Sequence, residues 1–167
     1  MKWLSAGRRF KPRLPAETTR GQPLASSSRT SGMIAYRGGM STWEDVSRIA
    51  LALPETVEQS SGDGLLAWRV KDKTFAWERP LRRSDLKALG DAAPEGPILA
   101  ARVPDLGAKE ALLAEAGGVY FTTPHFNGYP AILVRLAEIV VPDLEELLVE
   151  AWLDRAPKRL AKEYLAR

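Results

Sequence analysis

The chain has no cysteine among its 167 residues, only one histidine, and no long apolar run. The lack of cysteine excludes disulfides, thiolate nucleophiles and the cysteine-rich sites that hold zinc or iron–sulfur clusters. No stretch approaches the roughly 18 apolar residues that a membrane-spanning helix needs. We therefore expect a cytoplasmic protein that has no cofactor and no membrane contact.

Acidic residues are nearly absent from the first 39 residues, which hold eight basic residues and one acid. This segment is rich in Arg, Ser, Pro and Gly and has no apolar periodicity, so we expect a disordered basic extension over residues 1–39. A twin-arginine export signal would need an apolar stretch after Arg9, and prolines follow instead. A basic nucleic-acid-binding tail is an open alternative, but we favour translation that starts at Met40.

Residues 40–167 carry 16 basic residues and 20 acids, a net charge of −4, and we expect them to form one folded domain. Helices are predicted over residues 42–53, 84–89, 106–116 and 142–156, with a last one ending near Leu165. Strands are predicted over residues 65–70, 74–77, 97–103, 119–122 and 131–136, and residues 56–64 are predicted to be a loop. Strand pairs that follow each other along the chain favour an α+β fold: a mostly antiparallel five-stranded sheet with helices packed on one face.

The most informative segment joins the last two predicted strands. It holds the only histidine, His125, and an Asn127-Gly128 step that can take the left-handed angles of a reversal. A lone histidine can be a structural turn residue, a ligand contact or a general base. No second histidine and no nucleophile-base arrangement accompany it, so we expect no catalytic residue. The candidate ligand-contacting residues are Thr123, Pro124, His125, Asn127, Gly128 and Tyr129.

Basic residues gather in three places and could contact phosphates. They are Arg69, Lys71 and Lys73 on the predicted hairpin, Arg79, Arg82 and Arg83 after it, and Lys158, Arg159 and Lys162 near the C-terminus. Acids lie between them, so an ordinary solvated surface is the alternative. We also interpret the aromatic residues on the strands as core in preference to base-stacking platforms.

Four carboxylates, at Asp143, Glu146, Glu150 and Asp154, recur on one face of a predicted helix. Hard oxygen ligands of this kind could bind iron weakly. A solvated acidic face is the simpler interpretation, so we predict no metal site.

Two segments carry a resemblance to a known family: TTPHFNGYPAILVRL at residues 122–136 and AWLDRAPKRLAKEYL at residues 151–165. With the helix exit ALALPE at residues 50–55, they resemble the MmcQ/YjbR family from Met40 onward. The resemblance implies a frataxin-like (CyaY-like) α+β fold and DNA as the partner. We therefore expect a monomeric, non-enzymatic domain that binds DNA through the basic hairpin and the C-terminal helix. The alternative is a small-molecule or protein-interaction module that uses the His125–Tyr129 turn.

Overall fold

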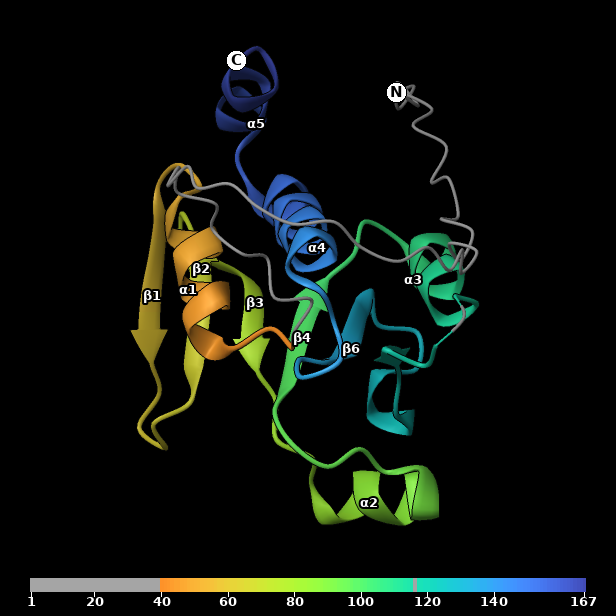
Figure 1. Cartoon of the computed structure of the whole chain (residues 1–167). Coiled ribbons are helices and arrows are strands. Elements are labelled where there is room, and N and C mark those ends of the chain that lie inside the picture. Colours follow the sequence, from red (N-terminus) through yellow and green to blue (C-terminus); the bar gives the residue numbers. More distant parts are fainter. Residues whose placement is uncertain (1–39, 116) are drawn as a thin grey trace, which may run out of the picture. The chain divides into compact units, whose positions relative to one another are not determined.

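The computed structural model describes residues 40–115 and 117–167, so the predicted extension over residues 1–39 lies outside the described residues. In these two ranges the chain forms one antiparallel sheet of six strands in the order β1-β2-β3-β4-β6-β5 (Figure 1). The strands are β1 (Thr56–Ser60), β2 (Leu66–Val70), β3 (Lys73–Glu78), β4 (Ile98–Arg102), β5 (Tyr120–Phe121) and β6 (Ala131–Arg135). The α+β class predicted from the sequence is confirmed.

The helices are α1 (Trp43–Leu51), α2 (Arg83–Leu89), α3 (Leu106–Leu113), α4 (Val141–Arg155) and α5 (Lys158–Leu165), with short 3-10 turns η1 (Gly90–Ala92) and η2 (Pro124–Phe126). Thr42 caps α1, in a capping box with Asp45. The N-cap of α2 is Arg82, and Ser84 lies inside the helix. The Asp85 carboxylate accepts the Arg82 N–H at 2.9 Å, which gives one backbone donor at the start of the helix a hydrogen-bond partner.

The main hydrophobic core lies between one face of the sheet and helices α1 and α4 (Figure 1). Trp68, Phe75 and Trp152 are its largest fully buried side chains. One side of α4 is buried, through Leu144, Leu147, Leu148, Ala151 and Trp152. The Trp152 indole N–H also donates to the Pro54 carbonyl at 3.2 Å, which joins α4 to the exit of α1.

A second, smaller cluster lies on the opposite face of the sheet. It consists of Ile98, Ala100, Phe126, Ala131 and Leu133, with half-buried Trp77, Leu81 and Phe121 against it. Because side chains alternate along a strand, β4 and β6 supply residues to both clusters. The η2 turn and the segment after β3 therefore cover part of the face that the main helices leave open.

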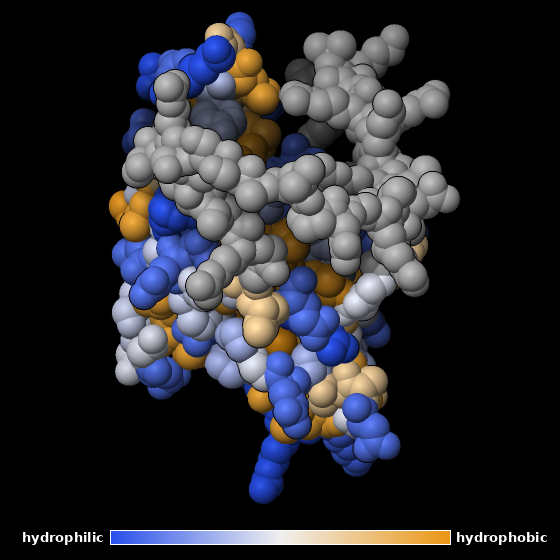
Figure 2. All heavy atoms as spheres, in the orientation of Figure 1, coloured by the Kyte–Doolittle hydropathy of each residue, from blue (hydrophilic) through white to orange (hydrophobic). Residues whose placement is uncertain are grey.

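The predicted loop over residues 56–64 is wrong in its first half, because Thr56–Ser60 forms β1 and pairs with β2. Every residue of β1 except Thr56 is exposed, so an apolar alternation could not reveal it. β1 accounts for the sixth strand of the sheet. Figure 2 shows hydrophilic residues interspersed with hydrophobic ones over the described surface of this view. No helix in the described ranges is long and apolar enough to cross a membrane.

Candidate binding groove

A groove of about 770 Å³ opens where the end of β3 meets the η2 turn. Its walls come from Asp63 and Leu65 before β2, from residues 77–82, and from residues 125–129. This volume lies within the range of about 300–1,000 Å³ that is typical of small-molecule sites. The groove thus places the predicted turn residues beside Trp77, a residue more than forty positions earlier in the chain.

The turn from Thr123 to Tyr129 is built from local backbone hydrogen bonds. The Phe126 N–H donates to Thr123 O at 2.9 Å, and the Tyr129 N–H donates to Phe126 O at 3.1 Å. Gly128 has a φ of +69°, as predicted, and Asn127 does not, because its φ is −61°. These angles are those of a type II turn, in which only the third residue is left-handed. Thr123 is buried beneath the turn, whereas Pro124, His125, Asn127, Gly128 and Tyr129 are exposed.

Lys109 of α3 holds both ends of this turn. Its Nζ donates to Phe126 O at 2.6 Å and to Tyr129 O at 3.1 Å, and the residue is only 5% exposed. Burial lowers the pKa of Lys109 because the charged form loses hydration. No carboxylate lies within ion-pair distance of Lys109 in the described part of the chain. The ammonium therefore fixes the backbone of the turn and adds positive charge next to it.

An ion pair beneath the groove fixes the other wall. Arg79 and Asp85 are both buried, and the Arg79 Nη2 lies 3.0 Å from the Asp85 Oδ2. Burial alone would raise the pKa of Asp85. The Arg82 N–H and the Arg79 charge outweigh burial, so this pKa lies below its usual value. The Arg79 guanidinium also lies 5.4 Å from the centre of the Phe126 ring. Arg79, which the sequence offered as a phosphate contact, is thus held inside the wall.

Aromatic rings follow one another along the groove. Ring centres are 6.4 Å apart for Trp77 and Phe126, and 6.1 Å apart for Phe126 and Tyr129. His125 packs edge-on against Phe126 at 5.2 Å. The Arg102 guanidinium lies 4.7 Å from the centre of the Tyr129 ring, on the side of β4. Such spacings are typical of interacting rings, so Trp77 and Tyr129 pack on the buried Phe126 between them.

The other basic residues predicted on either side of β3 lie at its opposite ends. Lys71 and Lys73 lie at the start of β3, whereas Arg82 and Arg83 follow its end, about 20 Å away for a six-residue strand. Lys71 pairs with Glu55, Arg69 bonds Gln59 at 2.9 Å and also the Asp72 carbonyl, and Arg159 pairs with Glu163 at 3.5 Å. Lys158 and Lys162 are exposed on α5. The DNA-contacting role of these residues stays a prediction.

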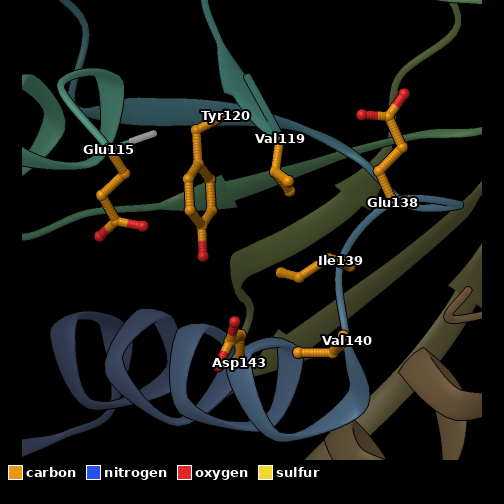
Figure 3. A pocket seen from close by; sticks show the side chains of 7 residues that line it. All are labelled: Glu115, Val119, Tyr120, Glu138, Ile139, Val140 and Asp143. Atoms are coloured by element: carbon orange, nitrogen blue, oxygen red, sulfur yellow. The ribbon is translucent and has the colours of Figure 1, made fainter. Parts of the chain in front are cut away.

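A second, smaller pocket of about 110 Å³ lies between β5 and the start of α4 (Figure 3). The Tyr120 hydroxyl points toward the end of α4 that carries Asp143, and the Glu138 carboxylate points away. Burial, and after it the charges of Asp143 and Glu146, raise the pKa of Glu115. Burial also raises the pKa of Tyr120, with a smaller contribution from Glu115. The acids here repel each other, and the described residues that line this pocket include no cation.

The carboxylates predicted as a helix face lie along α4. Asp143, Glu146 and Glu150 are exposed, and Asp154 is half-buried with its Oδ2 3.9 Å from the Arg102 Nε. In residues 40–115 and 117–167, no group of three or more possible metal ligands is close enough to hold an ion.

Sequence reasoning missed Lys109 and Arg102 as parts of this site. Lys109 is 17 and 20 residues away from the carbonyls that it binds, and nothing in its helix distinguishes it from a surface lysine. Arg102 is the last residue of a buried strand, and a single charged residue at that position indicates only that the strand ends there. A buried position for Lys109 could have been inferred only from the packing of α3 against the sheet.

Comparison with known proteins extends this picture. The YjbR family model matches residues 51–154. Uncharacterized proteins of Mycobacterium tuberculosis and Mycobacterium bovis are each 58% identical over 130 residues, covering 76% of this chain and 98% of the relative. A Deinococcus radiodurans protein, whose crystal structure is described as a DUF419 domain, superposes with a TM-score of 0.54 at 21% identity. That match covers 74% of this chain and 88% of the other, and it supports the fold. The chain belongs to the YjbR family.

Proposed function

We propose that this YjbR domain is a non-enzymatic binding module, and that the groove beside the His125–Tyr129 turn holds a small ligand. The observation that carries the proposal is the groove itself, about 770 Å³ with an aromatic floor and fixed walls. Concave sites with apolar walls and a few polar groups are typical of ligand pockets. Lys109 holds the turn and the Arg79–Asp85 pair holds the opposite wall before any ligand arrives, which lowers the ordering cost of binding.

Binding without chemistry fits the surroundings of the imidazole. His125 packs against Phe126, and the buried carboxylate of Asp85 is bonded to Arg79 and to the Arg82 N–H. A general base needs a partner that orients it, and this carboxylate is committed elsewhere. His125 is therefore proposed as a contact group at the rim of the groove.

Protein-observed NMR of the whole chain with small aromatic fragments tests this function. We expect the shifted amides to lie in residues 77–82 and 125–129. The exposed His125→Ala variant should weaken fragment binding about fivefold, as the loss of about 1 kcal/mol of ring contact implies. Its free energy of unfolding should change by less than about 0.5 kcal/mol. Lys87→Ala, exposed on α2 and outside the groove, is the matched control. Shifts that gather on another surface, or none at all, would contradict the proposal.

A further inference from the structure

We infer that the ligand of this groove is a planar aromatic ring that carries an anionic group, with the ring along Trp77, Phe126 and Tyr129 and the anion beside Arg82. The inference rests on the proposed function and names the class of ligand for that site. Three observations carry it: the rings, the distribution of cations, and the position of the acids.

The rings supply area for a flat ligand. Trp77 is half-buried and Tyr129 is 46% exposed, so both keep ring surface open to the groove, whereas Phe126 beneath them is 4% exposed. Trp77 tilts by 33° and Tyr129 by 53° from the Phe126 plane, which gives a curved wall. A planar ring can contact such a wall by offset or edge-to-face packing.

Two cations lie against the turn and a third lines the groove. Lys109 contacts two turn carbonyls without a carboxylate partner in the described ranges, and Arg102 lies over Tyr129 with its Nε 3.9 Å from the Asp154 Oδ2. Arg82 lines the groove, is exposed, and forms no ion pair with any residue that the structure describes. A guanidinium that is free at the mouth of a groove matches a carboxylate or a phosphate in geometry and charge.

The acids of the groove differ in their partners. Asp63 lines the groove from the segment before β2 and forms no ion pair with any described residue. Glu78 uses its Oε2 to accept the Leu66 N–H at 3.2 Å. Asp85 is buried and neutralises Arg79. Arg82 therefore favours an anion at the α2 end of the groove, because the nearby Asp85 is already paired with Arg79.

Three ligands that share an indole ring and differ in charge test the inference by NMR titration of the full-length protein. Indole-3-acetate is anionic, indole-3-acetamide is neutral and tryptamine is cationic. We expect indole-3-acetate to shift the Trp77 indole signal and residues 125–129 with a dissociation constant about tenfold lower than that of tryptamine. AMP should likewise bind more tightly than adenosine at the same residues.

Two neighbouring arginines, one that lines the groove and one outside it, test whether the preference for an anion arises at this site. Arg82→Gln should remove most of the preference for the anion and leave the neutral ring bound. Arg83→Gln, exposed and outside the groove, should preserve the preference. Equal affinity for the three indoles, or tighter binding of tryptamine, would overturn the inference and leave the proposed function intact. If none of the ring compounds shifts the NMR signals of the groove at millimolar concentration, both the inference and the proposed function are overturned.

Discussion

At the scale of single residues, the candidate site depends on a lysine that the sequence does not single out. Lys109 is buried and donates to two carbonyls of one turn. Hydrogen bonds from a charged donor are stronger than neutral ones, and without the ammonium each carbonyl would keep only its backbone donor. The shape of the groove is thus coupled to one side chain behind it.

We predict that Lys109→Met lowers the free energy of unfolding by about 2 kcal/mol, as expected for lost charged hydrogen bonds. The same variant should weaken ligand binding in the groove, because the turn loses its anchor. Chemical denaturation measures the first effect and NMR titration the second. Lys87→Met on exposed α2 should change stability by less than about 0.5 kcal/mol. A Lys109→Met protein as stable as the wild type would show that the anchor contributes nothing.

At the scale of elements, the sequence predicts those that bury an apolar face and misses those that do not. The buried stripe of α4 repeats at the helical period, and β4 and β6 are short continuous apolar runs that are buried on both faces of the sheet. β1 was missed because it is an exposed edge strand held by backbone pairing. The turn motif was located from its residue types, whereas the opposite wall of the groove depends on tertiary packing.

The junction of α3 and α4 offers a test of electrostatics between elements. Burial and the charges of Asp143 and Glu146 raise the pKa of Glu115 above its ordinary value of 4.5. A raised carboxyl pKa means that the folded state binds more protons, so this group lowers stability as pH rises through 4.5 and above. Glu115→Gln should therefore stabilise the protein at pH 7 by about 0.5 kcal/mol, a typical value for a partly exposed charge.

The gain from Glu115→Gln should disappear below about pH 4, where the carboxyl is protonated in both states. Denaturation at pH 7 and at pH 3.5 measures it. Glu110→Gln, exposed on α3, is the control and should show little change at either pH. A gain that is independent of pH would mean that the acids of this pocket do not repel each other.

At the scale of the whole molecule, charge is divided between two parts of the chain. Residues 1–39 carry a net charge of +7, and residues 40–167 carry −4. Within the described part, the basic residues lie at opposite ends of β3 and on α5. Phosphate neutralisation needs several cations along one surface, and each contact makes binding more dependent on salt.

We therefore expect any duplex DNA binding by the full chain to depend on residues 1–39 and to weaken steeply between about 50 and 200 mM salt. A mobility-shift titration of the full chain and of residues 40–167 measures this. Replacing Lys71 and Lys73 by alanine should leave the binding unchanged. Salt-resistant binding by residues 40–167, lost on that double replacement, would instead establish the hairpin as a DNA contact.

The most direct test of the central claim is a crystal structure of the protein grown with indole-3-acetate. We expect electron density for the ring between Trp77 and Tyr129, with the carboxylate within hydrogen-bonding distance of Arg82. A structure in which the turn is clear, the compound is bound on another surface and the groove holds only solvent would contradict it.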